Sequence, residues 1–406
     1  MYDAIIVGAR CAGAPTAMLL ARKGYRVLAV DRATFPSDTI STHIVWPHGA
    51  EIMGEWGLRD RLAATGCPPI ARHLTFDVGP FALEGGVIDT NAGRGGFCPR
   101  RTVLDKLLVD AAIEAGAEVR EGFSVETLLW QGDRVAGIKG RSRSRTMVEE
   151  RARVVIGADG VHSVVAKTVR APGYDTRPAL TTNYYSYYSG FDTDDLEMYV
   201  RDHHAVGCFP THDRLTLVAV LWHSTRFEEV RGDIEAHVWK VLECTPTVAG
   251  RLREAVREEK WYGTAGVPNY FRKPFGPGWA LVDDAAYDKD PITAQGISDA
   301  FIDAQRLTDA LDDAWSGRRP LDDALSDYQA RRDERVKPLY DFTCELARLE
   351  PPPPRMQQLF AALRSNPDAT NRFFSAITGS SPLPAFMDPA NLQLILTRAG
   401  RPSTDT

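Results

Sequence analysis

The first 31 residues carry the feature that most constrains the fold. Tyr2–Val7 is an apolar run of strand length, which is typical of a strand buried on both faces. Gly8 follows it directly and provides a tight turn, and Ala14–Lys23 then has the pattern of a helix that ends at Gly24. Arg26–Val30 is a second apolar strand. This order of elements predicts a β–α–β unit in an α/β protein with a parallel sheet.

The turn after the first strand is a candidate dinucleotide-binding loop. Asp31 follows the second strand, about 20 residues after Gly8, where an acid that binds a ribose hydroxyl is expected. Bare glycine backbone at a helix N-terminus permits close approach of a pyrophosphate. We therefore expect the following residues to contact a dinucleotide: Gly8, Arg10, Cys11, Ala12, Gly13, Asp31 and Arg32.

Arg10 departs from the G-x-G-x-x-G pattern, because it stands where the second glycine is usual. A side chain there cannot lie beneath the pyrophosphate, so we expect it to swing aside and to donate to a phosphate. The alternative is a glycine-rich turn without a ligand. The ordered succession of strand, turn, helix, strand and acid favours the dinucleotide.

Composition limits the class of protein. A chain of 406 residues is long enough for two domains or for one domain with large insertions. The hydrophobic content of 44% and charged content of 25% are ordinary for a globular enzyme, and the net charge of −6 argues against a nucleic-acid partner. The sequence contains no stretch of about 18 apolar residues, so no membrane span is predicted. The six scattered cysteines predict no metal site and, together with a core strand that begins at residue 2, a cytoplasmic location.

Two further glycine and aspartate motifs follow apolar strands later in the chain. The second motif is Gly157-Ala-Asp159-Gly160-Val-His-Ser163, after Arg153–Ile156. The third is Asp283-Asp284-Ala-Ala, followed by Pro291 and Gln295-Gly296, after Trp279–Val282. Ligands of open α/β sheets bind at the carboxyl ends of the strands, so we expect these motifs to meet the first loop at one sheet edge.

The remaining segments of the chain differ in composition and in hydrophobic patterning. Tyr174–Tyr270 is rich in aromatic residues, alternating patterns and turn residues, which predicts an antiparallel sheet with one helix, Gly232–Leu242. Gly296–Ala314 and Leu321–Leu349 are predicted helices, the second kinked by its internal proline. Short helices and a loose tail should follow.

In combination, these motifs resemble those of the group A flavoprotein monooxygenases. This family has the para-hydroxybenzoate hydroxylase fold and includes geranylgeranyl-reductase-like and flavin-halogenase branches. The likeness covers about residues 2–335 and includes Arg101, Leu104 and Leu108, which are similar to the family's R-x-x-L helix start. It implies an α/β fold in which a Rossmann-like FAD-binding domain of the glutathione-reductase type is interleaved with an antiparallel-sheet substrate domain, with C-terminal helices added.

The resemblance also suggests how the chain is divided. We place the FAD-binding domain at residues 1–71, 95–172 and 271–320, the substrate-binding sheet at residues 72–94 and 173–270, and a C-terminal helical region at residues 321–406.

The resemblance implies FAD as cofactor and NADPH or NADH as transient reductant. Arg101 would contact the cofactor, Asp159 and Gly160 would organise contacts to FAD and the nicotinamide, and Asp284 would bond the ribityl chain. The helix N-terminus at Gly296 would face the flavin ring and stabilise its reduced anion. The ring-side contacts would be Pro291, Gln295, Gly296 and Ile297.

The third motif departs from the family pattern. Asp283 and Ala294 each stand where the family has glycine, and Asp288 adds another acid to the same loop. A carboxylate beside an anionic pyrophosphate is repelled. We therefore expect weakened FAD binding, which Asp283→Gly should tighten.

The implied reaction is transfer of oxygen from a flavin C4a-hydroperoxide, formed with O2, to an aromatic or polycyclic small molecule, most simply as a hydroxylation. Three residues are candidates for catalysis. Tyr185 lies in a tyrosine-rich strand, His212 lies in a segment that resembles one reaching the family's pocket, and His43 lies in a loop that passes near the flavin. Ordinary strand composition and a structural histidine are the alternatives.

Three other functions remain open. A flavin-dependent C=C reductase shares the same motifs. A halogenase is disfavoured because no Trp-x-Trp occurs in the chain. A degenerate flavin-binding protein is suggested by Arg10, Asp283 and Ala294.

Overall fold

Three motif-bearing strands lie side by side in one sheet. The computed structural model describes residues 1–88, 95–193 and 195–399. The sheet has the order β19-β20-β10-β1-β2-β7. Its strands are β1 (Tyr2–Val7), β2 (Val27–Asp31), β7 (Glu118–Glu121), β10 (Met147–Gly157), β19 (Phe275–Gly276) and β20 (Trp279–Leu281). Along this path all pairs are parallel except that of β19 with β20. Off the path, β9 (Arg134–Arg141) pairs antiparallel with β10, and β8 (Ser124–Gln131) pairs antiparallel with β9.

The register brings the ends of these strands together. Val7 pairs with Gly157, and Gly157 pairs with Leu281, so the three motifs leave the sheet at one edge. A close backbone contact joins the first two motifs, because the Ala158 N–H donates to the Val7 carbonyl at 2.8 Å. The expected meeting of the motifs at one sheet edge is confirmed.

Alternation along β1 divides its side chains between two cores. Ala4 and Ile6 pack with helices, whereas Ile5 and Val7 pack toward a hairpin on the other face. The helices on the first face are α1 (Gly13–Arg22), α2 (Pro47–Glu55), α3 (Arg59–Ala63), α4 (Arg101–Glu114) and α9 (Gly296–Trp315). The other face is covered by β8 (Ser124–Gln131), β9 (Arg134–Arg141) and α5 (Val164–Thr168).

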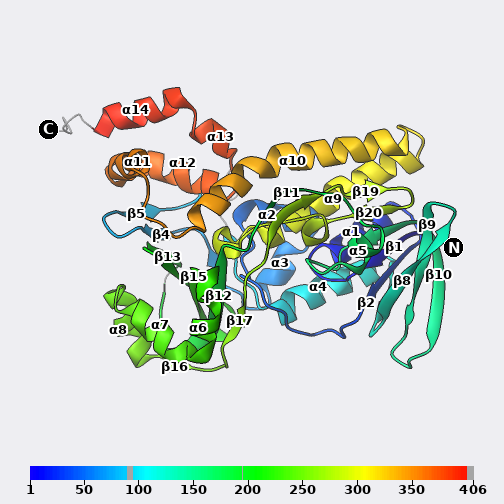
Figure 1. The fold of residues 1–406 in the computed structure, drawn as a ribbon, viewed down its shortest axis with the longest axis horizontal. Helices are drawn as coiled ribbons and strands as arrows, with labels where there is room; N and C mark the ends of the chain where they lie inside the picture. Colours follow the sequence, from blue (N-terminus) through cyan, green and yellow to red (C-terminus); the bar gives the residue numbers. More distant parts are fainter. Residues whose placement is uncertain (89–94, 194, 400–406) are drawn as a thin grey trace.

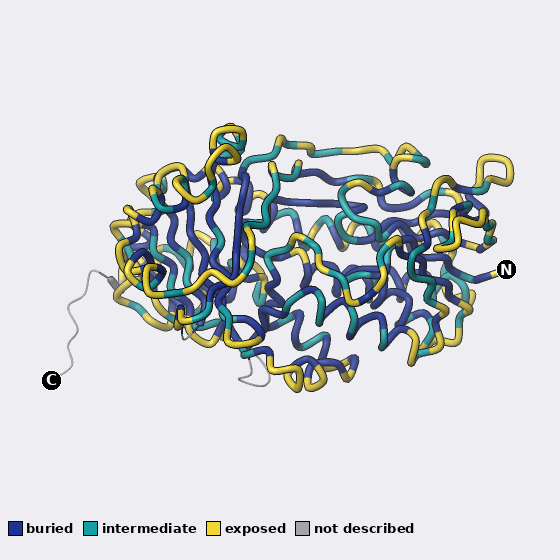
Figure 2. The backbone as a smooth tube through the Cα atoms, turned by 90° about the horizontal axis from the view of Figure 1, so that it is seen from below, coloured by how far each residue is buried: buried dark blue, intermediate teal, exposed yellow. Residues whose placement is uncertain are grey.

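A second, mostly antiparallel sheet lies beside the first (Figure 1). Its main path is β16-β12-β15-β14-β13-β4-β5, with β17 paired to β12. The strands are β4 (Leu74–Asp77), β5 (Ala82–Gly85), β12 (Thr181–Ser189), β13 (Leu196–Arg201), β14 (His204–Pro210), β15 (Thr216–His223), β16 (Val256–Arg257) and β17 (Tyr262–Thr264). Its strands come from both sides of the second motif, so the two sheets are interleaved in sequence. In Figure 2 most of the exposed backbone lies at the periphery of the molecule, and buried backbone runs through its interior.

Three helices cover the outer face of the second sheet, where the sequence predicted one over Gly232–Leu242. They are α6 (Phe227–Gly232), α7 (Ile234–Leu242) and α8 (Pro246–Glu254). The prediction of a single helix was wrong because each helix is nine residues or shorter, too few turns to stand out beside alternating strands. Asp233 separates α6 from α7, and its carboxylate accepts from the Ala236 N–H at 3.1 Å.

Small sheets and C-terminal helices complete the fold. The strands are β3 (Pro69–Ile70) with β6 (Gly96–Phe97), and β11 (Gly173–Arg177), β18 (Asn269–Arg272) and β21 (Tyr287–Asp288). The helices are α10 (Leu321–Leu346), α11 (Pro354–Arg364), α12 (Pro367–Ile377), α13 (Leu383–Phe386) and α14 (Pro389–Ala399). Pro338 lies inside α10. The α/β fold class is confirmed; the predicted segments that include residues 89–94 and 400–406 lie partly outside the described residues.

Within the three described stretches of chain, no helix combines the length and apolar content that a membrane crossing requires.

Gly8 is required where the first two motifs touch. Its φ is +98°, and a Cβ there would lie 2.3 Å from the Ala158 carbonyl oxygen. Gly24 also has a positive φ, +87°, but no atom lies within 4 Å of its Cβ position. A substitution at Gly24 therefore tests backbone strain alone, whereas the same substitution at Gly8 adds a clash with the backbone.

We predict that Gly24→Ala lowers the free energy of unfolding by about 1 kcal/mol, through backbone strain alone. Gly8→Ala should cost at least ~3 kcal/mol, because the clash adds to a similar strain. Melting temperatures measured by circular dichroism check the order. Equal losses in the two variants would contradict the close contact between the motifs.

Candidate active site

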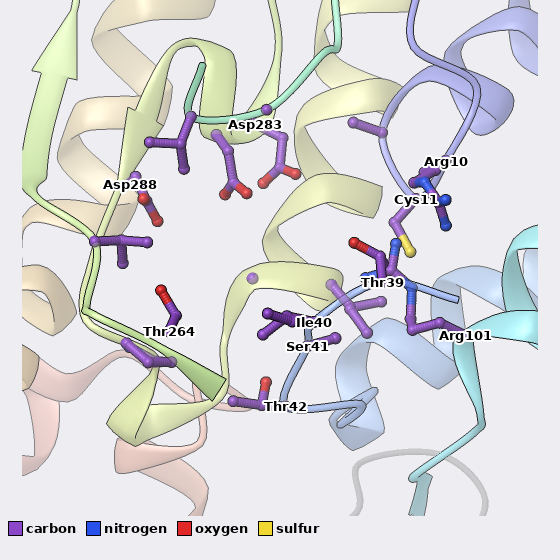
Figure 3. Close-up of a pocket in the computed structure, with 18 of the residues that line it drawn as sticks. Arg10, Cys11, Thr39, Ile40, Ser41, Thr42, Arg101, Thr264, Asp283 and Asp288 are labelled. Atoms are coloured by element: carbon purple, nitrogen blue, oxygen red, sulfur yellow. The ribbon is translucent and has the colours of Figure 1, made fainter. Parts of the chain in front are cut away.

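A cavity of about 650 Å³ begins at the shared strand edge and extends to the second sheet. Figure 3 shows Arg10 and Cys11 on one side of it, Asp283 and Asp288 across from them, and the segment from Thr39 to Thr42 below. The cavity thus has one wall from the motif loops and one from the second sheet.

Most of the expected cofactor residues line this cavity. They are Gly8, Arg10, Cys11, Ala12, Asp31, Arg32, Arg101, Asp159, Gly160, Asp284, Pro291, Gln295, Gly296 and Ile297. Gly13 lies behind the loop, where a Cβ would fall 1.8 Å from the Gly8 carbonyl oxygen. The structure therefore brings together residues from three distant parts of the sequence.

Asp31 holds the first loop against the end of β2. Its carboxylate accepts from the Ala9 N–H at 2.8 Å and from the Ala33 N–H at 2.8 Å. The side chain is almost fully buried and still borders the cavity. This places an acid beside the glycine turn, as a ribose-binding role requires.

The Arg10 side chain is directed to a buried carboxylate. It pairs with Asp105 of α4 and donates to the Ser37 hydroxyl at 2.9 Å. Arg101 also holds Asp105, with its Nε 3.0 Å from Oδ1, and the Cys11 thiol lies 3.3 Å from the same oxygen. Two guanidinium groups thus share one carboxylate beside the cofactor loop.

Sequence reasoning missed Asp105. Its position four residues after Arg101 on one helix face was a usable signal, because residues at this spacing are neighbours. Its contact with Arg10 joins distant segments and had no local signal.

Asp159 shapes the second motif from within. It accepts from the Ser163 hydroxyl at 2.5 Å and from the Val164 N–H at 2.6 Å. Ser163 in turn caps α5, with its Oγ accepting from the Ala166 N–H at 3.0 Å. Burial raises the pKa of Asp159. The carboxyl therefore fixes the turn that borders the cavity.

Three carboxyl groups of the third motif crowd one side of the cavity. Burial, reinforced by the charge of Asp284, raises the pKa of Asp283 and of Asp288 well above the ordinary value. Burial likewise raises the pKa of Asp284 to about 6. One oxygen of Asp288 is fully buried and has no hydrogen-bond partner among the described residues. Asp283 and Asp288 therefore favour the protonated form near neutral pH, whereas Asp284 is mostly ionised there.

Near these three carboxyls, another buried carboxylate, Asp299, is paired with two cations. Lys289 pairs with Asp299 in the first turn of α9, and Arg335 of α10 lies 2.6 Å from the other Asp299 oxygen. Although burial alone would raise the pKa of Asp299, these two cations lower it. Asp299 therefore keeps its charge and ties α10 to the third motif. Sequence reasoning missed this cluster because its partners come from a loop and two separate helices.

Both glycine positions of the third motif that this chain replaces have a left-handed backbone. The φ values are +55° at Asp283 and +53° at Ala294. Glycine adopts this conformation without cost, aspartate tolerates it, and alanine is strained there. The chain thus retains the loop geometry without the residue that favours it.

The candidate catalytic residues differ in how close they lie to the cavity. Tyr185 lines the cavity, and its hydroxyl is buried without a hydrogen-bond partner among the described residues. His43 lies behind it, with their ring centroids 5.5 Å apart, and its Nε2 is 2.9 Å from the Tyr187 hydroxyl. Burial lowers the pKa of His43 to about 3, so its imidazole is neutral.

His212 is not brought to the cavity. Its Nδ1 accepts from the Arg100 N–H at 3.1 Å, and its Nε2 lies 2.8 Å from the Thr65 hydroxyl. These contacts connect the second sheet to the start of α4. Both ring nitrogens are engaged, which favours a positioning function over proton transfer at the cavity.

Among the residues that the structure describes, no three His, Cys, Asp or Glu side chains gather in a way that could hold a metal ion.

The site residues fit FAD. The N-termini of α1 and α9 both border the cavity, so that N–H groups can meet a pyrophosphate and a flavin ring. The Gln295 side chain points toward α12, because its Nε2 donates to the Ile377 carbonyl at 3.3 Å. No atom lies within 4 Å of a Cβ placed on Gly296, so there is room for a ligand at the predicted flavin end.

We predict that Asp283→Gly lowers the FAD dissociation constant about tenfold, because it removes a carboxyl near the pyrophosphate and relieves the backbone. Asp283→Asn should give part of the gain, since it removes a carboxyl that must stay protonated beside an anionic pyrophosphate and keeps the left-handed residue. Ala294→Gly is the matched control: it should raise the melting temperature with little change in affinity. Fluorescence titration with FAD measures all three, and an unchanged constant for Asp283→Gly would contradict the prediction.

We also predict a pH dependence from these carboxyls. Their raised pKa values in the folded state mean that their contribution to stability is complete below pH 4 and is lost as the pH rises toward neutral. Asp283→Asn carries no such penalty. Its melting temperature relative to the unsubstituted protein should therefore rise between pH 4 and 7, and a difference independent of pH would refute this assignment.

Residues 1–343 match the FAD-binding domain family. Digeranylgeranylglycerophospholipid reductase 2 of Methanopyrus kandleri is 24% identical over 363 residues, covering 86% of each chain. FixC of Salmonella typhi is 30% identical over 176 residues, which are 41% of this chain and 38% of FixC. The match thus spans about two fifths of the length of FixC.

Solved structures share the fold. The flavin-dependent brominase Bmp2 superposes with a TM-score of 0.81 at 18% identity, covering 98% of both chains. PqsL of Pseudomonas aeruginosa, in complex with 2-aminobenzoylacetate, gives a TM-score of 0.70 at 20% identity, covering 93% of this chain and 99% of PqsL. The family match over most of the chain, together with this cavity, shows that the protein belongs to the group A flavoprotein monooxygenase family and is an FAD-dependent oxidoreductase.

Proposed function

We propose that the protein is a monooxygenase that uses FAD, NAD(P)H and O2 to hydroxylate an aromatic or polycyclic small molecule. One observation carries this proposal: a single cavity joins the three cofactor motifs to an uncharged wall of the second sheet. A cofactor bound at the motifs would place its reactive ring against a substrate held on that wall.

Five parts of the chain would hold the cofactor. The α1 N-terminus would meet the pyrophosphate, Asp31 a ribose and Asp284 the ribityl chain, while Arg101 and the α9 N-terminus would face the rest of the molecule. When bound, FAD supplies the redox and oxygen chemistry. The protein supplies position and a cavity that excludes water.

The chain also offers a residue that can contact the substrate. Tyr185 borders the cavity, and the rings of His43 and Tyr187 pack edge-on behind it. Burial lowers the pKa of His43 and raises that of Tyr187, so their 2.9 Å contact joins two neutral groups. We assign Tyr185 to contact with the substrate, and His43 and Tyr187 to positioning Tyr185.

A C=C reductase is the second candidate, because a digeranylgeranylglycerophospholipid reductase is similar over most of the chain. An apolar wall would also suit an isoprenoid. The two reactions differ in oxygen use: hydroxylation consumes one O2 for each product, whereas reduction of a double bond consumes none.

We predict that protein loaded with FAD loses its flavin absorbance when NADPH or NADH is added without air, and regains it when oxygen is admitted. With substrate, oxygen uptake should match product one to one. Asp284→Asn should weaken FAD binding, while Asp322→Asn, at an exposed acid of α10, should not. Product without oxygen uptake would identify a reductase, and a flavin that neither nucleotide reduces would identify a degenerate flavin-binding protein.

A further inference from the structure

The two walls of the cavity differ in charge. Its charged lining residues come from the motif loops, from Arg101 at the start of α4 and from residues 283–299. By contrast, every described residue that residues 173–270 contribute to the lining is uncharged. On β15, for example, the lining residues are Leu217, Ala219 and Leu221. A charged group on a substrate would have no counterion there.

Three cations at or beside the cavity are already engaged in ion pairs, and Arg32 lines it next to Asp31 of the cofactor loop. Arg101 is bound to Asp105, and Lys289 is bound to Asp299. Arg100 pairs with Glu259 at 2.7 Å and stacks on the Tyr187 ring, 3.8 Å from its centroid, and it does not line the cavity. Recruiting any of these three paired cations to a substrate anion would break a buried pair, which is costly.

The middle of the uncharged wall is flat. Gly207 and Ala219 pair across β14 and β15, and Ala219 pairs with Tyr185 of β12. A Cβ on Gly207 would lie 2.5 Å from the Phe209 ring, so the ring lies across the glycine. Small residues beside aromatic rings make a surface that suits a planar, apolar molecule.

Besides the Tyr185 hydroxyl, Asn183 brings free hydrogen-bonding groups to this wall. It lies on β12 two residues before Tyr185, on the same face of the sheet, and pairs with Leu221 and Thr264 in neighbouring strands. Its side chain lines the cavity, is nearly buried, and makes no hydrogen bond with another described residue. A nearly buried amide without a partner is costly unless a ligand satisfies it.

We propose that the substrate is an uncharged, largely apolar planar molecule with one hydroxyl or carbonyl group, which the Asn183 amide binds. This inference rests on the proposed function, since it assigns the second sheet to the substrate. Asn183 is then the residue that orients the substrate, and the missing counterion excludes carboxylates.

The test compares two probes of the same shape, the neutral ketone 2-acetylnaphthalene and the anion 2-naphthoate. With FAD-loaded protein, a shift of flavin absorbance on titration should show that the ketone binds at least ~30-fold more tightly, because the anion is desolvated without a partner. Asn183→Leu should weaken ketone binding about tenfold and leave binding of plain naphthalene unchanged.

Met198 provides a matched pair of control variants. It lines the cavity, is half-buried and carries a long unbranched side chain, so lysine fits in its place. Met198→Lys should shift the preference toward 2-naphthoate at least tenfold, whereas Met198→Leu should not. This shift is also visible in protein fluorescence without FAD, which tests the wall even if the cofactor is not reduced.

A ketone that fails to bind at least tenfold more tightly than the carboxylate overturns the inference, as does an Asn183→Leu variant that binds the ketone normally. The failure of the proposed function is a separate result, namely a flavin that neither NADPH nor NADH reduces.

Discussion

The structure depends on the parallel pairing of β1, β10 and β20. Their shared register fixes where the three motifs leave the sheet, and the contact of Gly8 with Ala158 holds two of them within van der Waals distance. The motifs are more than 100 residues apart in sequence, so no local preference could assemble them. Burial of β1 on both faces supplies the driving force, because a slip of one residue would exchange its two cores. This register brings the three motifs to the sheet edge where the cavity begins.

The buried carboxyl groups around the cofactor loops fall into two kinds, those paired with cations and those whose pKa is raised. Asp105 lies between two arginines and Asp299 between Lys289 and Arg335, so each buried carboxylate has its own cations. The carboxyls of Asp283, Asp284 and Asp288 have raised pKa values instead. Burying a charge without a partner costs more than protonating it. The site thus combines permanent ion pairs, which position helices, with acids that exchange protons.

Local sequence patterns predicted much of this fold. The strand, turn and helix of the first 31 residues were predicted to within about one residue, because glycine turns and apolar periods act over short distances. The predicted FAD residues gather at one cavity for the same reason, since each motif follows its own strand. Helices α6 and α8 were missed because they are short. The sharing of Asp105 and the bonds that hold His212 outside the cavity were invisible, since they join segments more than 90 residues apart.

The place of β20 in the sheet has a consequence for synthesis. It pairs with β10, whose other side is already covered by β1, yet it is made only when residue 279 leaves the ribosome. Until then the carboxyl end of β10, Val155–Gly157, is an open edge with free N–H and C=O groups. Such edges recruit other chains. The late synthesis of β20 therefore leaves this short edge open to pairing with another chain until residues 279–281 close it.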